Sequence, residues 1–217
     1  MTATENSALQ PASVHDQPGE GHALEQATHY VAQLGQALLA TDAVVAAVSD
    51  DEWSTATGCP EWTAHDLLNH LVGGNLTVAA LLVGHAPPHP ADDHLDGNPL
   101  TAYRASGDAL RAAFGEPGAL ERTVTLPMGV VSGAVALHLR LTELLVHGWD
   151  LARATGQPVT GLPADLAEQE LAFSRAQLDR IPPERRPFAV SQPVADNAPA
   201  VDRLAALLGR PVPVSES

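Results

Sequence analysis

Lysine is absent from the sequence, since all eleven basic residues are arginines. Its absence excludes Schiff-base chemistry at a lysine and a phosphate-binding P-loop lysine. Cysteine occurs once, as Cys59, so the chain cannot form an internal disulfide. This cysteine content is compatible with a reducing compartment, and we expect the protein in the cytoplasm. Aromatic residues make up only 4% of the chain, which favours the packing of alanine- and leucine-rich helices over a β-sandwich.

Long hydrophobic runs are also missing, because no stretch reaches the run of about 18 apolar residues that spans a membrane. Residues 1–21 lack the basic and apolar regions of a signal peptide, and their polar, proline-containing sequence predicts a disordered tail. Positive charge is scarce: 26 acidic residues outnumber 11 basic ones and give a net charge of −15. Such a chain repels phosphate backbones, so we expect neither nucleic acid nor a membrane as a partner.

Helical periodicity is the strongest signal that the sequence contains. Over residues 21–49, apolar residues recur in steps of three and four, as in a helix of an antiparallel bundle. The pattern predicts a mainly all-α fold, with a four-helix bundle over residues 22–160 and a C-terminal helical extension over residues 161–213. Helices are predicted over residues 21–49, 63–83, 99–114, 132–155, 163–181 and 199–208, and a short strand over residues 122–126.

The helix predicted over residues 132–155 carries a narrow stripe of ionisable side chains. Spacings of three, four and three place on one side Arg140, Glu143, His147 and Asp150. Leucine and valine flank this stripe on both sides, so we expect it to point into the protein. A solvated face with ordinary ion pairs is the alternative. The remaining polar sector is the better candidate for solvent, and it contains His138, Thr142, Trp149 and Arg153.

The helix predicted over residues 63–83 is apolar nearly all round, with one polar side. Thr63 and Asp66 have the spacing of a capping box at its start. His70 lies on the same side as Asp66, and it is either a core histidine with hydrogen-bonding partners or a ligand that faces the ionisable stripe. Gly73 and Gly74 follow it, at a cost of about 1 kcal/mol each in a helix. Two such glycines predict a close approach of backbone or an open cavity.

These two helices together suggest a metal site formed by His70, Glu143 and His147. Two imidazoles and one carboxylate suit Zn²⁺ or another divalent first-row ion, and three protein ligands leave a position open for catalysis. Asp66 and Asp150 are candidates for the partners that orient the two histidines. Arg140, one turn from Glu143, would either clamp a substrate carboxylate or form a salt bridge with Glu143.

Two segments resemble the signatures of a known family. They read Cys59-Pro-Glu-Trp-Thr-Ala-His-Asp-Leu-Leu-Asn-His70 and Glu143-Leu-Leu-Val-His-Gly-Trp-Asp150, and the terminal Asp202-Arg-Leu-Ala-Ala-Leu-Leu-Gly-Arg210 is similar to the end of the shorter members. The family is that of the mycothiol-dependent maleylpyruvate isomerase-like proteins, within the DinB-like superfamily of metal-binding four-helix bundles. The resemblance spans about residues 24–213, and the paired signatures are specific only when taken together.

The resemblance implies a divalent metal, usually zinc, held by the residues that match the family's ligands, namely His70, Glu143 and His147. It also implies mycothiol as a cofactor, which leaves the protein without need of a nucleophile of its own, so that Cys59 is expected to serve in packing. The implied function is isomerisation or thiol transfer on a small electrophilic substrate, by a monomer or a homodimer. The characterised isomerase has a larger C-terminal domain, which puts maleylpyruvate itself in doubt as substrate.

Two other functions stay open at this point. A metal-binding bundle without thiol chemistry would act as a lyase, a hydrolase or a natural-product tailoring enzyme through water activated at the metal. A non-catalytic binding protein would use the bundle as a scaffold only. The effect of thiols on the protein separates the first function from the metal-dependent alternative without thiol chemistry. Full metal occupancy with an open coordination position would count against the non-catalytic alternative.

Overall fold

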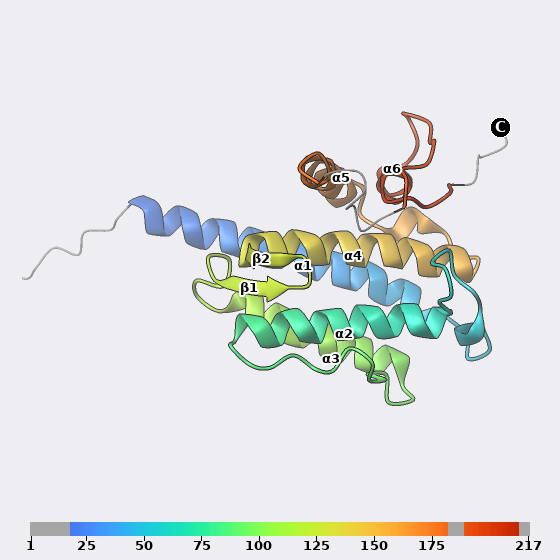
Figure 1. The fold of residues 1–217 in the computed structure, drawn as a ribbon, viewed down its shortest axis with the longest axis horizontal. Helices are drawn as coiled ribbons and strands as arrows, with labels where there is room; N and C mark the ends of the chain where they lie inside the picture. The colour runs from blue at the N-terminus through green and yellow to red at the C-terminus, as the bar shows by residue number, and fades with distance from the viewer. Residues whose placement is uncertain (1–17, 182–188, 213–217) are drawn as a thin grey trace, which may run out of the picture.

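Four long helices form the body of the molecule (Figure 1). The computed structural model describes residues 18–181 and 189–212, and the helices are α1 (Pro18–Ala46), α2 (Ala64–Leu82), α3 (Pro99–Gly115) and α4 (Gly133–Ala154). Helix α1 packs against α3 and α4, and α2 packs against the same two helices. The predicted DinB-like four-helix bundle is therefore confirmed, although α1 begins at Pro18 rather than near Gly21. The predictions for residues 1–17 and 213–217 lie outside the described residues.

Capping residues explain where the helices begin. Thr63 and Asp66 form the predicted capping box at the start of α2, with each side chain bonded to the other residue's backbone N–H. Asn98 and Ser132 accept hydrogen bonds from the first turns of α3 and α4. Gly84, just after α2, has a φ of 77°, which glycine adopts without strain.

A small β-hairpin joins α3 to α4. Strand β1 (Thr123–Leu126) pairs antiparallel with β2 (Gly129–Ser132), and the register runs from Thr123 opposite Ser132 to Leu126 opposite Gly129. The first strand was predicted from its alternating residues. The second was not predicted, because Met128 to Gly133 reads only as a lead into the next helix. Gly129 has a φ of 127°, which allows the two-residue turn before it.

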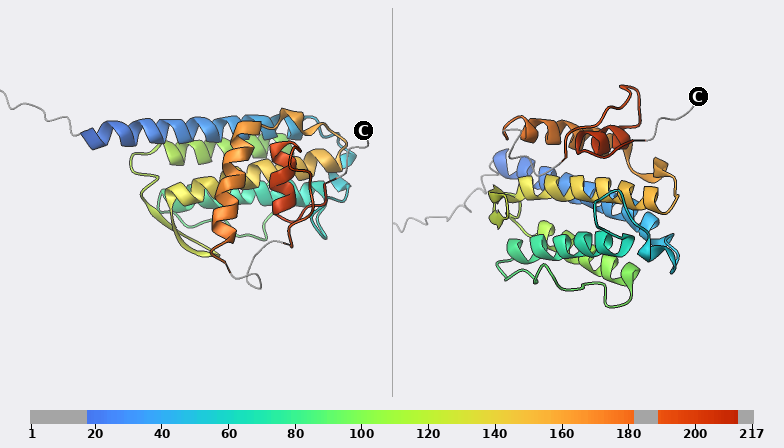
Figure 2. Two further views of the ribbon diagram at one scale, coloured as in Figure 1. Left: turned by 90° about the horizontal axis from the view of Figure 1, so that it is seen from above. Right: turned by 45° about the vertical axis from the view of Figure 1, so that its right-hand side comes forward.

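The C-terminal extension lies on α4, on the side away from α2 and α3. It contains α5 (Ala164–Leu178) and α6 (Ala200–Leu207), which pack on each other and on α4 (Figures 1 and 2). Short 3₁₀ turns at Glu52–Ser54 and Val159–Gly161 complete the described elements. Helix α4 is consequently covered by the bundle on one side and by the extension on the other. Among the described residues, no helix is both long and apolar enough to cross a membrane.

The predicted solvent exposure of one sector of α4 is wrong for Thr142 and Trp149, because the extension covers them. Thr142 and Trp149 are buried, and Trp149 donates from Nε1 to the carboxylate of Asp202 in α6 at 2.6 Å. Thr142 donates to the carboxylate of Glu170 in α5 at 3.1 Å. The remaining members bond to the same two carboxylates at 2.9 and 3.2 Å: His138 is partly buried, whereas Arg153 is exposed, as predicted. Polar residues mark this face because it is a polar helix–helix contact.

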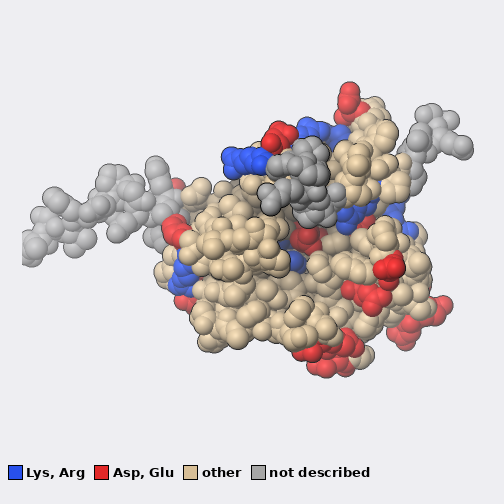
Figure 3. All heavy atoms as spheres, viewed as in Figure 1, with Lys and Arg blue, Asp and Glu red and all other residues tan. Residues whose placement is uncertain are grey.

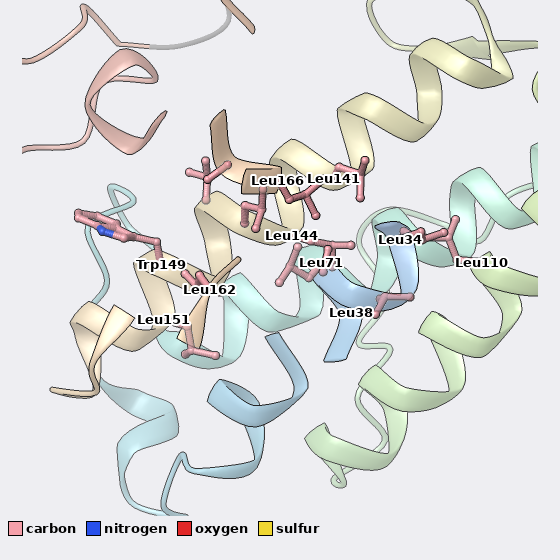
Figure 4. Packing of buried hydrophobic residues seen from close by; sticks show 14 of the residues in the cluster. Leu34, Leu38, Leu71, Leu110, Leu141, Leu144, Trp149, Leu151, Leu162 and Leu166 are labelled. Carbon is pink, nitrogen blue, oxygen red and sulfur yellow. The ribbon is translucent and has the colours of Figure 1, made fainter. Parts of the chain in front are cut away.

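The hydrophobic core runs through the bundle and continues under the extension (Figure 4). Leu34, Leu71, Leu110 and Leu144 are fully buried, one from each of the four bundle helices. Leu166 of α5 joins the same cluster from the other side of α4. One continuous core of this kind makes the extension part of the same folded unit.

Gly133→Ala is expected to destabilise the protein, by about 1–3 kcal/mol for an overpacked site. A Cβ at Gly133 would overlap the carbonyl oxygen of Ala119, which is backbone and cannot turn aside. Gly115→Ala is the matched control, since its Cβ would meet nothing within 4 Å and its φ is not positive. That substitution is expected to stabilise by about 0.4–1 kcal/mol. Urea unfolding of both variants measures the difference, and equal stabilities would contradict this packing.

Candidate metal centre

The side chains of His70, Glu143 and His147 meet in the space between α2 and α4. Nε2 of His70 lies 2.9 Å from Oε2 of Glu143, and Nε2 of His147 lies 3.1 Å from the same oxygen. The ligand atoms all lie within 4.8 Å of one another, which is the spacing of groups that could hold a metal ion. Two imidazole nitrogens and a carboxylate oxygen are a donor set that zinc accepts. The residues present therefore fit the predicted ion.

The cluster is buried on one side and open on the other. His147 is buried, whereas the His70 side chain keeps 41% of its surface exposed and that of Glu143 28%. The rings of the two histidines meet edge to face, with centroids 5.2 Å apart. The cluster is therefore accessible to solvent at His70 and Glu143, whereas His147 is buried in α4.

Asp150 supports the buried histidine from behind. Its Oδ2 lies 3.0 Å from Nδ1 of His147, and the carboxylate side chain is fully buried. A carboxylate on the second ring nitrogen orients a metal-binding histidine and raises its basicity. The structure thus brings Asp150 to the place that its predicted supporting role requires.

Electrostatic coupling is strong between Glu143 and His147. Burial acts to raise the pKa of Glu143, but the charge of His147 and hydrogen bonds from His147 and His70 hold that pKa well below its usual range. Burial acts to lower the pKa of His147, but the charge of Glu143 and hydrogen bonds to Asp150 and Cys59 hold it well above its usual range. In the metal-free protein this pair is therefore an imidazolium beside a carboxylate.

Zinc binding near pH 7 is expected to release about one proton per ion, because the metal must displace the proton of His147. A raised pKa stabilises the metal-free fold below the unfolded-state pKa of histidine, and this stability is lost as pH rises through the folded-state pKa. Zinc affinity should fall as pH drops, because protons compete with zinc for the ring nitrogen of His147. Titration calorimetry in two buffers with different ionisation enthalpies measures the proton release. An observed enthalpy that is independent of the buffer would contradict the charged state of His147.

Arg140 is buried and tied to α2. Its Nη2 donates to the carbonyl oxygen of Leu71 at 3.2 Å and to Oδ1 of Asn75 at 2.9 Å, and its Nε has no hydrogen-bond partner among the described residues. Burial lowers the pKa of Arg140, and the charge of Glu143 partly restores it. A Cβ on Gly74 would overlap Nη1 of Arg140, so the predicted close approach at the glycine pair is confirmed. The carboxylate-clamp role of Arg140 stays a prediction.

Asp66 does not meet His70 in the structure. Its Oδ2 accepts hydrogen bonds from the backbone N–H of Thr63 at 2.9 Å and from the Thr63 hydroxyl at 2.6 Å. These bonds lower the pKa of Asp66, which is exposed to solvent. The ring of Trp62 instead lies beside His70, with its centroid 4.9 Å from that of His70 and 6.0 Å from that of His147. The expected supporting role of Asp66 is replaced by helix capping.

Sequence reasoning also missed Arg210 and the polar contacts of Cys59. Cys59 packs against the core as expected, but its Sγ also lies 3.3 Å from Oδ2 of Asp150 and 4.0 Å from Nδ1 of His147. Arg210 donates to Asp150 at 3.0 Å and lies 3.6 Å from Cys59 Sγ. Cys59 and Arg210 both stand in segments that resemble the family. The sequence alone does not indicate that these segments lie close together in the fold.

A second set of donor atoms, Cys59, His147 and Asp150, also lies within 4.8 Å. The guanidinium of Arg210 already supplies this set with positive charge, through contacts with both Asp150 and Cys59. A cation there would have to displace or repel Arg210. Around Glu143 no cationic side chain other than the two histidines lies within 4.0 Å among the described residues, so this set is the better candidate for a metal ion.

Two cavities lie elsewhere in the molecule. One of about 330 Å³ is lined by the α1 segment around Ala27 and by residues 114–121, and one of about 340 Å³ lies between α2 and α3 near Ala79 and Ala113. Neither is lined by a residue of the cluster.

The fold and the cluster define a DinB-like four-helix bundle that presents two histidines and a glutamate from two of its helices. A family model described as mycothiol maleylpyruvate isomerase N-terminal domain matches residues 34–152. Because this match spans more than half of the 217 residues, the chain belongs to that family. The matched segment contains the whole His70–Glu143–His147 cluster and ends before the C-terminal extension.

Relatives and solved structures agree with this assignment. Two uncharacterized proteins of Mycobacterium tuberculosis, Rv0738 of strain H37Rv and MT0763 of strain CDC 1551, are each 39% identical over 171 residues, covering 78% of this chain and 91% of theirs. The crystal structure of the mycothiol-dependent maleylpyruvate isomerase is similar with a TM-score of 0.56 at 16% identity, over 76% of this chain and 72% of that one. A mutant of that enzyme gives 0.56 at 15% identity. At such identity the likeness shows the fold alone.

Proposed function

We propose that the protein is a metal-dependent enzyme that uses a low-molecular-weight thiol, such as mycothiol, for isomerisation or thiol transfer on a small electrophilic substrate. The observation that carries the proposal is the convergence of Nε2 of His70 and Nε2 of His147 on one oxygen of Glu143. These three residues would hold the ion, for which zinc is the best candidate. Membership of the mycothiol maleylpyruvate isomerase family supports the thiol part of the proposal.

A bound divalent ion would lower the pKa of a thiol or a water that it coordinates, and would so supply a nucleophile near neutral pH. The residues of the chain prepare the place for it. Asp150 holds Nδ1 of His147, so that Nε2 of the same ring faces the cluster. The ring of Trp62 lies against that of His70, with centroids 4.9 Å apart. The partly exposed His70 leaves an approach for the thiol and its substrate.

The charge of the protein opposes a nucleic-acid partner, and a small molecule is the partner that this proposal requires. The net charge of −15 opposes nucleic acid, and Figure 3 shows acidic side chains gathered towards the lower right of that view, over loops. Cys59 is not required as a nucleophile, because the cofactor would bring its own thiol. A cytoplasmic location, and a monomeric or homodimeric state, stay parts of this proposal.

Thiol binding provides the test of this function. Mycothiol at millimolar excess is expected to raise the unfolding temperature of the zinc-loaded protein, by an amount equivalent to about 2.7 kcal/mol at a hundredfold excess over its Kd. The metal-free protein should show no comparable shift, because the thiol would bind at the ion. In protein loaded with Co²⁺, the same addition should change the visible absorption spectrum, as expected when sulfur joins the ion's ligands.

Mercaptoethanol and ethylene glycol form a matched pair of small probes, since they differ in sulfur against oxygen. Only the thiol is expected to change the Co²⁺ spectrum. A spectrum that is unchanged by mercaptoethanol and mycothiol alike would overturn the thiol part of the proposal. It would favour the alternative of a lyase, hydrolase or tailoring enzyme that uses water.

A further inference from the structure

Arg210 connects the C-terminal extension to the candidate metal centre. It follows α6, and its guanidinium donates to both carboxylate oxygens of Asp150, from Nε at 3.3 Å to each and from Nη2 at 3.0 Å to Oδ2. Nη2 also lies 3.6 Å from Sγ of Cys59, and Nη1 donates to the carbonyl oxygen of Leu208 at 2.9 Å. The side chain keeps only 14% of its surface exposed. This arginine is therefore fixed in one orientation.

The carboxylate that Arg210 binds is the one that orients His147. Oδ2 of Asp150 lies 3.0 Å from Nδ1 of His147 and 3.0 Å from Nη2 of Arg210. Asp150 is fully buried, and a buried carboxylate needs a paired cation and further hydrogen bonds to remain ionised in place. Arg210 supplies that cation from a segment 60 residues away in the sequence.

In the described part of the chain, the other ion pairs between an arginine and the extension do not reach the cluster. Arg153 binds Asp202 at 3.2 Å, and Arg203 binds Glu168 and the carbonyl oxygen of Ala198. Both pairs join the extension to neighbouring residues, and neither includes a residue of the cluster. Arg210 differs from them because its carboxylate partner continues the chain of contacts to a residue of the cluster.

We propose that Arg210 is a positioning residue of the metal centre: it holds Asp150 against His147, and the C-terminal extension thereby completes a site whose ligands all lie in the bundle. The inference rests on the proposed metal function. It also goes beyond the family match, which ends at residue 152 and does not include Arg210. The extension is consequently part of the functional unit, although it supplies no ligand.

Zinc affinity in a double-mutant cycle tests this role, by competition with a chromophoric chelator. Arg210→Ala is expected to weaken zinc binding by about tenfold or more, the loss that follows removal of an outer partner of a metal ligand. In the Asp150→Asn background, Arg210→Ala should cause no further loss, because the arginine acts through that carboxylate. Arg210→Lys, which keeps the charge but not the fork of donors, should recover part of the affinity.

Arg203→Ala is the control, since Arg203 lies in the same extension and touches neither Asp150 nor the cluster. It should bind zinc as tightly as the wild type. The inference is overturned if folded Arg210→Ala binds zinc normally, or if its loss persists in full in the Asp150→Asn background.

Failure of the proposed function gives a different result. If the wild-type protein binds no zinc, the function is wrong, and the same cycle is then measured on the unfolding free energy of the metal-free proteins. Non-additive effects of Arg210→Ala and Asp150→Asn would support the Arg210–Asp150 contact that positions His147. Additive effects would overturn it.

Discussion

His147→Ala is expected to reduce bound zinc from a stoichiometric amount to none. His147 supplies the buried ligand, with its Nε2 3.1 Å from Glu143 and its Nδ1 held by Asp150 at 3.0 Å. With His147 gone, His70 and Glu143 would remain, and two ligands from two different helices do not form the three-ligand set of a catalytic zinc site. Metal analysis of the purified, dialysed variant measures the loss, and His70→Ala should give the same result.

His65→Ala is the matched control for both substitutions. His65 also lies on α2 and contacts a carboxylate, that of Asp93 at 3.8 Å, but it belongs to neither cluster of donor atoms. The control variant should retain its zinc. Stoichiometric zinc in His147→Ala, in a protein that still unfolds cooperatively, would contradict the ligand assignment.

Trp149→Ala is expected to destabilise the protein by about 3–5 kcal/mol, the usual range for loss of a buried tryptophan. Trp149 is 3% exposed between α4 and the extension, and its Nε1 donates to Asp202 at 2.6 Å. The variant would leave a cavity and deprive a buried carboxylate of one donor. Denaturant unfolding measures the change.

Trp53→Ala provides the comparison, because Trp53 is only partly buried, in the short turn before α2. Its loss should be clearly smaller than that of Trp149. Equal losses, or a fully stable Trp149→Ala protein, would show that the extension does not rest on α4 as described.

The Trp149 face also shows where sequence reasoning ends. Periodicity predicts which positions of a helix share a side. Together with the family resemblance, it predicted that His70, Glu143 and His147 meet, and their donor atoms do lie within 4.8 Å of one another. It does not tell whether a polar side faces water or another helix's carboxylates. Trp149 was assigned to solvent because its neighbours Arg153 and Thr142 are polar, yet those residues bond to Asp202 and Glu170 of the extension.

The missed parts of the site have the same cause. Arg210 reaches Asp150 because α6 packs on α4, and Cys59 reaches it from the loop before α2. No local sequence pattern encodes either contact. Asp66 was expected to assist His70 because the two lie on one helix face, but its place in the first turn favours capping. Local signals, such as the Thr63 cap, the helix spans and strand β1, were predicted well because each depends on neighbouring residues.

X-ray absorption at the zinc edge, on zinc-loaded protein free of added thiol, tests the metal assignment most directly. Zinc held by His70, Glu143 and His147 should show only nitrogen and oxygen ligands, at about 2.0–2.2 Å, with the multiple-scattering pattern of two imidazoles. A sulfur ligand at about 2.3 Å would instead place the ion at the Cys59, His147 and Asp150 set and contradict the assignment.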